Sequence, residues 1–242
     1  MVYGTTRGTV PKDKNPEAQF IKIADNSECI NLISDLKPTH FLNLSRGETD
    51  QDFAMHQECI KRCNKLEIRY GYASSFNACD NQLIDDHLEA EKSNAKSAYG
   101  IFKAKCEEEL FSRGKKFCIF RFSATHGFAS NRIARTEDFL KKLKNGEKFT
   151  VHSGLFQNRT FVGDLAGMMC DVLLDSDSQG IFHLGTYDKS EEVDFFKKMA
   201  KKFGYSGERV VIGTPTPINA SIRKQAFEKV FSIRPRADFF SG

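Results

Sequence analysis

The sequence lacks the features of a membrane protein and of a dedicated nucleic-acid-binding protein. It has no apolar run long enough to span a bilayer, and its first residues show no signal-peptide pattern. Its 36 Lys and Arg are scattered among 32 Asp and Glu, which leaves a net charge of +4 and no long basic block. We therefore expect a cytoplasmic protein that binds neither nucleic acid nor a membrane.

The cysteine spacing of a metal site is also missing. The chain has seven cysteines, but no two of them form a Cys-x-x-Cys pair. Cys59 and Cys63 are four residues apart, which places both on one face of a helix. An odd number of thiols in a cytoplasmic protein favours free, buried cysteines, and we expect no metal site.

The sequence does contain alternating strand and helix patterns. With 242 residues, 40% hydrophobic and 28% charged, the chain can bury a substantial core. Short apolar segments predict strands at 20–25, 39–44, 68–73, 116–122 and 180–185. Amphipathic segments predict helices at 27–36, 52–65, 136–145 and 190–203. This alternation is typical of an α/β fold with a parallel sheet and covering helices.

The most informative stretch covers residues 69–110. A predicted strand ends just before Ser75, and a predicted helix carries Tyr99 and Lys103. A phenol and an ammonium four residues apart on a helix project from the same face. The ammonium is expected to lower the pKa of the phenol, so that it can exchange a proton at a carbonyl or hydroxyl carbon. A serine hydroxyl at a strand end could hold the same oxygen, which makes these residues a candidate proton-transfer site.

This stretch resembles the extended short-chain dehydrogenase/reductase superfamily. Its members have a strand that ends in Ser-Ser or Ser-Thr and then Tyr-x-x-x-Lys, often with Gly after the Tyr, and YGIFK at 99–103 matches this pattern. TFVGDLA at 160–166 resembles a segment of nucleotide-sugar reductases and epimerases. The resemblance implies a Rossmann-like parallel sheet with helices on both faces, a small C-terminal substrate-binding lobe, and catalysis by Ser75, Tyr99 and Lys103.

The resemblance is weakest at the N-terminus, where family members bind their cofactor. There a strand runs into a glycine-rich turn and a helix whose N-terminus receives the pyrophosphate. Only Gly4 and Gly8 match, and the third glycine and the first helix have no counterpart. The resemblance implies NADP or NAD as cofactor. Asp25 would meet the adenine, Arg7 would favour a 2′-phosphate, and Lys103 would hold the nicotinamide ribose.

The resemblance also implies how the chain is divided. Residues 1–124 and 156–186 would form the cofactor-binding domain, and residues 125–155 and 187–242 the substrate lobe. In the family this lobe covers a nucleotide sugar.

Arginines suit the diphosphate of a nucleotide sugar because they make bidentate hydrogen bonds. Arg159 and Arg223 are the candidates in this sequence, and Ser75 would contact the sugar.

The nearest likeness is to the dTDP-4-dehydrorhamnose reductase branch. It implies reduction of the 4-keto group of a nucleotide-linked deoxysugar, with Tyr99 as the proton donor. Two alternatives remain open, a nucleotide-sugar epimerase and a non-catalytic binding or regulatory relative; the shortened glycine loop favours the second. A dehydratase usually has an acid beside the catalytic serine. In this sequence Phe76 and Asn77 follow Ser75, which argues against a dehydratase. A homodimer is compatible with each of these functions.

Overall fold

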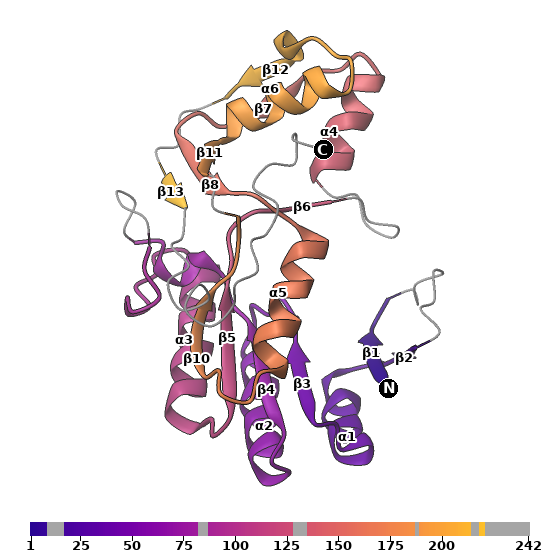
Figure 1. Ribbon diagram of the computed structural model, residues 1–242, viewed down its shortest axis with the longest axis vertical. Coiled ribbons are helices and arrows are strands. Elements are labelled where there is room, and N and C mark those ends of the chain that lie inside the picture. Colours follow the sequence, from indigo (N-terminus) through magenta and orange to yellow (C-terminus); the bar gives the residue numbers. More distant parts are fainter. Residues whose placement is uncertain (9–16, 82–86, 128–134, 187–188, 214–217, 221–242) are drawn as a thin grey trace.

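The centre of the fold is a four-stranded parallel sheet with the strand order β10-β5-β4-β3 (Figure 1). The computed structural model describes residues 1–8, 17–81, 87–127, 135–186, 189–213 and 218–220. The four strands are β3 (His40–Asn43), β4 (Arg69–Ala73), β5 (Phe117–Arg121) and β10 (Gly180–His183). Every residue of β4 and β5 is buried, as expected for inner strands of a parallel sheet that is covered on both faces.

Helices cover both faces of this sheet. The helices on one face are α1 (Asn26–Leu36), α2 (Asp50–Lys65) and α3 (Ala98–Arg113), and α5 (Val162–Leu174) covers the other. Successive side chains of a strand point to opposite faces. Ile119 accordingly packs with α2 and α3, whereas its neighbour Phe120 packs with α5. The predicted α/β fold, a Rossmann-like parallel sheet with helices on both faces, is confirmed.

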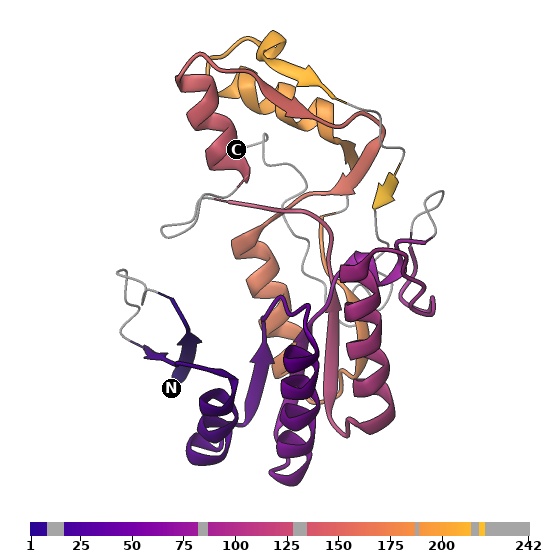
Figure 2. The ribbon, with the colours of Figure 1, turned by 180° about the vertical axis from the view of Figure 1, so that it is seen from behind.

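A lobe of short elements lies beyond the carboxyl ends of the sheet strands (Figures 1 and 2). Its elements are α4 (Arg135–Lys144), β7 (Phe149–Val151), β8 (Leu155–Asn158), β11 (Lys189–Glu191), α6 (Glu192–Lys202), η2 (Gly207–Arg209), β12 (Val210–Ile212) and β13 (Ile218–Ala220). They include the sheets β12-β7 and β11-β8-β13. A short parallel pair, β6 (Thr125–His126) and β9 (Thr160–Phe161), lies between this lobe and the main sheet.

The lobe has an apolar core of its own. The rings of Phe139, Phe149 and Phe196 have centroids 4.8–5.0 Å apart, and they join α4, β7 and α6. These core residues fall in the ranges assigned to the substrate lobe from the sequence. The domain boundaries themselves stay a prediction.

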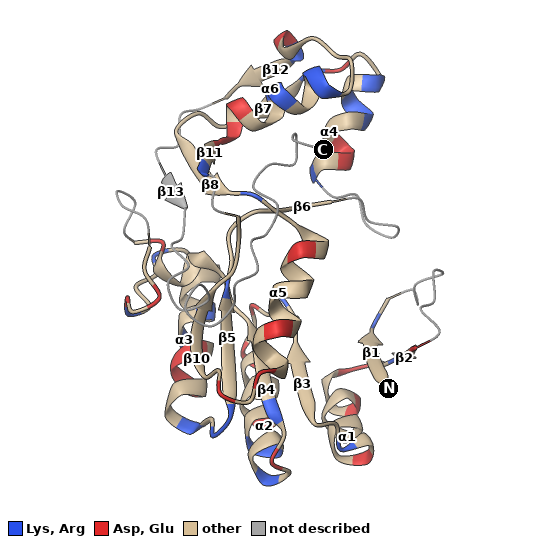
Figure 3. Ribbon diagram, viewed as in Figure 1, with Lys and Arg blue, Asp and Glu red and all other residues tan. Residues whose placement is uncertain are grey.

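Charges of both signs are interspersed along α2, α3, α4 and α6 (Figure 3). α4 and α6 have acidic residues in their first turns and lysines in their last turns, which matches the helix dipole. Among the described residues, no helix has the length and the apolar character needed to cross a bilayer.

The N-terminal residues form a separate small sheet. β1 (Val2–Thr6) pairs in parallel with β2 (Ala18–Lys22). Gly4 lies inside β1 opposite Phe20, and a Cβ on Gly4 would come within 2.8 Å of that ring. The sequence analysis assigned Gly4 to the glycine-rich turn after the first strand, and the structure corrects this by placing Gly4 within β1. The residues around Gly4 are β-branched and aromatic, which favours a strand.

Candidate active site

Three segments meet at the carboxyl edge of the parallel sheet, where ligands bind in open α/β folds. Ser75 follows β4, and Ser45 follows β3. The first turns of α3 bring Tyr99 and Lys103 to the same edge. The structure therefore brings together the three residues that were predicted to be catalytic, Ser75, Tyr99 and Lys103.

The start of α3 is held against the short 3-10 helix η1 (Phe76–Cys79). Ser97 caps α3 by accepting a hydrogen bond from the Gly100 N–H at 3.0 Å. The carboxylate of Asp80, directly after η1, accepts hydrogen bonds from the hydroxyl of Ser97 and, at 3.2 Å, from its backbone N–H. At Gly100 the two backbones approach so closely that a Cβ would lie 2.2 Å from the carbonyl oxygen of Asn77. This approach requires glycine.

Tyr99 is half-buried, and its hydroxyl is hydrogen-bonded to the side chain of Ser75. The guanidinium carbon of Arg46 lies 5.0 Å from the centroid of the Tyr99 ring. Burial raises the pKa of Tyr99, although the hydrogen bond from Ser75 and the charge of Arg46 act in the opposite direction. The sequence analysis expected a lowered pKa caused by Lys103, and this expectation was wrong. Because burial is the largest effect, the phenol keeps its proton at neutral pH.

Lys103 is 1% exposed, and its ammonium is hydrogen-bonded to two backbone carbonyls. Nζ donates to the carbonyl oxygen of Ala73 at 2.9 Å and to that of Ser45 at 3.3 Å. It lies 4.7 Å from the ring centroid of Tyr72 and 5.7 Å from that of Tyr99. Burial lowers the pKa of Lys103 to about 8. An ammonium has three N–H donors, so a third remains for a ligand oxygen.

A buried ion pair lies next to the candidate active site. The sequence analysis did not assign it a role. Glu107 and Arg121 are each 1% exposed, and Nη2 of Arg121 lies 2.7 Å from Oε2 of Glu107. Ser74 and Ser93 donate hydrogen bonds to the two carboxylate oxygens, each at 2.5 Å. The pair joins β5 and α3 to the end of β4. A sequence signal for it exists, because Glu107 is four residues after Lys103 and therefore on the same face of the helix.

The other predicted cofactor-binding residues lie in the N-terminal sheet and at the start of α1. Gly4 lies inside β1, and Arg7 and Gly8 follow this strand and are exposed. Asp25 is the N-cap of α1, where its Oδ1 accepts two backbone N–H groups at 2.8 and 3.1 Å. These hydrogen bonds explain the local role of Asp25, and its contact with adenine stays a prediction.

A cleft of about 290 Å³ in the lobe contains Arg159. The guanidinium carbon of Arg159 lies 4.8 Å from the ring centroid of Phe195. Its Nε and Nη2 atoms are buried and have no hydrogen-bond partner within the described part of the chain. Burial lowers the pKa of Arg159 to about 10 and that of the adjacent His126 to about 4. A buried cation with unused N–H groups fits an anionic ligand. The second predicted arginine, Arg223, lies outside the described residues.

Comparisons with known proteins show to which family this chain belongs. The family described as RmlD substrate binding domain matches residues 51–237, which is more than half of the chain. The chain belongs to this family. No curated protein matches it.

Several solved structures share the fold of this RmlD-family chain. A dTDP-glucose 4,6-dehydratase from Bacillus anthracis in complex with NAD has a TM-score of 0.82 at 13% identity, over 94% of this chain and 78% of that chain. A dTDP-4-dehydrorhamnose reductase from the same organism in complex with NADP has a TM-score of 0.76 at 14% identity, over 93% and 88%. A UDP-N-acetylglucosamine 4-epimerase from Bacillus cereus has a TM-score of 0.76 at 17% identity, over 98% and 83%. At these identities the likeness establishes a shared fold.

Replacing Gly100 with Ala tests the close approach between α3 and η1. The added methyl group would meet the carbonyl oxygen of Asn77, so α3 or η1 must shift. We expect G100A to lower the Tm measured by thermal denaturation. Gly167 in α5 is the matched control, because a Cβ there meets nothing within 4 Å and Ala is favoured over Gly in a helix by about 1 kcal/mol. A Tm that rises equally in G100A and G167A would contradict the close approach.

Proposed function

We propose that the protein is an oxidoreductase that uses NADPH or NADH to reduce the 4-keto group of a nucleotide-linked deoxysugar. The observation that carries this proposal is the meeting of Ser75, Tyr99 and Lys103 at the carboxyl edge of the sheet. Membership of the RmlD substrate binding domain family supports it, as does the shared fold with a dTDP-4-dehydrorhamnose reductase that was solved with NADP.

In the proposed mechanism Ser75 and Tyr99 hold the keto oxygen of the substrate by hydrogen bonds from their hydroxyls. A nicotinamide, when bound, supplies the hydride that the keto carbon accepts. As negative charge develops on the oxygen, Tyr99 transfers its phenolic proton to it, and the product is an alcohol. Because the pKa of Tyr99 is raised, the phenol carries its proton before the reaction.

The residues around Lys103 fit the nicotinamide ribose of the proposed cofactor. The ammonium is fixed by two carbonyls and has a third N–H that can donate to a ribose hydroxyl. With a pKa of about 8, Lys103 is mostly protonated at neutral pH. For the other end of NADP or NAD, the residues we propose are Gly4, Arg7, Gly8 and Asp25.

The cleft around Arg159 fits the diphosphate of the proposed nucleotide sugar. Two unpaired N–H donors of a buried guanidinium can make bidentate hydrogen bonds to phosphate oxygens. The cleft lies beyond the carboxyl edge of the sheet, so a substrate could reach from Arg159 toward Ser75. Arg223 is proposed as a second contact to the diphosphate.

One observation favours a second function, which is binding without turnover. The strands β1 and β2 form a sheet separate from the four-stranded sheet, whereas in a Rossmann fold the first strands belong to the main sheet and carry the pyrophosphate site. A relative of this kind would bind a nucleotide sugar through Arg159 and would take no nicotinamide.

The state of the cysteines indicates the cellular compartment in which the proposed reaction takes place. The described cysteines are all free, which is typical of a reducing compartment, and we assign the protein to the cytoplasm. Its proposed partners are small molecules rather than nucleic acid or membranes, in a pathway such as dTDP-rhamnose biosynthesis, and a homodimer is compatible with this role.

Replacing Tyr99 with Phe tests the proton donor. The variant keeps the ring but loses the acidic hydroxyl, so we expect kcat to fall by about 10²- to 10⁴-fold. The measurement is NADPH oxidation with a 4-keto-6-deoxy nucleotide sugar as substrate. Tyr205 in the lobe provides the control, and Y205F should keep wild-type turnover. Unchanged turnover in Y99F would exclude Tyr99 as the donor.

Replacing Arg159 with Met tests the diphosphate site. Hydrogen bonds to a charged group contribute about 1.5–3 kcal/mol, so R159M should bind dTDP or UDP at least about tenfold more weakly in calorimetry. The control is R113M, because Arg113 is an exposed arginine on α3. Equal dissociation constants for R159M and R113M would show that the diphosphate does not bind in this cleft.

A further inference from the structure

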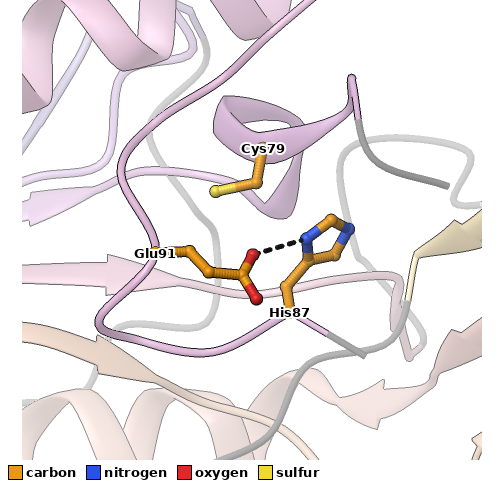
Figure 4. Close-up of side chains that lie close together, drawn as sticks. All are labelled: Cys79, His87 and Glu91. Carbon is orange, nitrogen blue, oxygen red and sulfur yellow. Dashed lines mark hydrogen bonds and ion pairs between the residues drawn. The ribbon is translucent and has the colours of Figure 1, made fainter. Parts of the chain in front are cut away.

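The segment between β4 and α3 carries three side chains of types that ligate metals in proteins. The proposed reaction does not use them. Cys79 is the last residue of η1, and His87 and Glu91 lie farther along the same connection. Figure 4 shows the three side chains pointing toward one another. Cys79 and His87 are each only 2% exposed.

The ligand atoms lie close enough together for a metal ion. One ligand atom from each side chain lies within 4.8 Å of the other two. Nδ1 of His87 and Oε2 of Glu91 are 3.1 Å apart. Zinc bonds of about 2.0–2.3 Å at a tetrahedral angle place the ligand atoms roughly 3.3–3.8 Å apart. The limit of 4.8 Å on the present separations is about 1 Å wider than that spacing.

Backbone N–H groups are hydrogen-bonded to Cys79 and Glu91, as outer-shell partners of a metal site are. Burial raises the pKa of the Cys79 thiol, and the hydrogen bond from the backbone N–H of Asn94 to its sulfur acts in the opposite direction, so binding of a metal ion would release the thiol proton. The backbone N–H of Leu88 donates to Oε1 of Glu91 at 2.9 Å, which leaves Oε2 directed at His87. Nε2 of His87 is buried and has no hydrogen-bond partner in the described ranges. Among the described residues, the imidazole is hydrogen-bonded through Nδ1, the atom that faces the cluster.

The types of the three ligand atoms indicate which metal ion the cluster would bind. A thiolate, an imidazole and a carboxylate form a mixed sulfur, nitrogen and oxygen set, which suits Zn²⁺ rather than Mg²⁺ or Ca²⁺. A thiolate and a carboxylate together carry two negative charges, which balance a divalent cation.

We propose that Cys79, His87 and Glu91 bind a Zn²⁺ ion that ties the connection between β4 and α3 to the end of η1. Because η1 begins directly after Ser75 and packs against Gly100, this ion stabilises the segment that positions the candidate active site. The sequence analysis expected no metal site, because no two cysteines form a Cys-x-x-Cys pair and free, buried cysteines were favoured.

The test begins with the wild-type protein, stripped of metal with a chelator and titrated with Co²⁺ as a spectroscopic substitute for Zn²⁺. We expect saturation at one ion per chain, with a sulfur-to-cobalt charge-transfer band and the visible bands of a tetrahedral site. Zn²⁺ should displace the cobalt and raise the Tm, since binding to the native state alone stabilises it. Saturable binding without a sulfur-to-cobalt band would overturn the proposal, as would no binding.

Two cysteine variants separate this site from adventitious thiol binding. C79A should lose the charge-transfer band and bind Zn²⁺ more than about tenfold more weakly. C170A removes the exposed cysteine and should leave both unchanged. If C79A does not fold, H87A tests the site through the affinity, and it should also bind Zn²⁺ more weakly than the wild type. A band that is lost in C170A and kept in C79A or H87A would contradict the proposed ligands.

Discussion

The candidate site depends on one buried ammonium. Nζ of Lys103 is bonded to the carbonyl oxygens of Ala73 and Ser45, so a single group joins α3 to the segments that follow β4 and β3. A buried charge is costly unless hydrogen bonds compensate it. This requirement restricts α3 to positions from which Nζ reaches both carbonyls. Tyr99 lies one turn earlier on the same face, so its position beside Ser75 follows from that of the lysine.

One turn after Lys103, the same face of α3 carries another buried charged group. Glu107 pairs with Arg121 of β5 and accepts a hydrogen bond from Ser74, which follows β4, and both charged groups are buried. Removing one partner of such a pair typically costs about 3–5 kcal/mol, because the other charge remains unpaired. A phenol, an ammonium and a carboxylate at successive turns thus attach one helix to two strands. Gly100 allows this helix to approach η1, so charge and backbone contact act on the same element.

The sequence predicted the main sheet and the two long helices of the lobe, at 136–145 and 190–203, but it did not predict the short strands of the lobe. The segments 68–73 and 116–122 were predicted as strands, and the structure has β4 and β5 there, because inner strands are continuous apolar runs. The strands β7 and β12 have only three residues each, which is too short for a periodic pattern. Gly4 was misplaced because a glycine pattern does not distinguish a turn from a strand.

Properties that depend on three-dimensional surroundings could not be predicted either. The spacing of Tyr99 and Lys103 predicted their common face, but the direction of the tyrosine pKa depends on burial by distant segments. Arg159 was named as a candidate from its residue type, yet its unpaired N–H groups result from the packing of the lobe. The cluster of Cys79, His87 and Glu91 likewise results from the path of one connection between β4 and α3.

The central claim is that Lys103 and its neighbours form a nicotinamide site, and calorimetry tests it most directly. NADPH and NADH are titrated separately into the wild-type protein, into K103M, and into K105M as a control on the exposed face of α3. The account predicts about micromolar binding of at least one dinucleotide to the wild type and to K105M. It predicts a loss of about tenfold or more in K103M, because a hydrogen bond from a charged group is removed. No binding of either dinucleotide to the wild type would contradict the account, and equal binding to K103M would exclude Lys103 from the site.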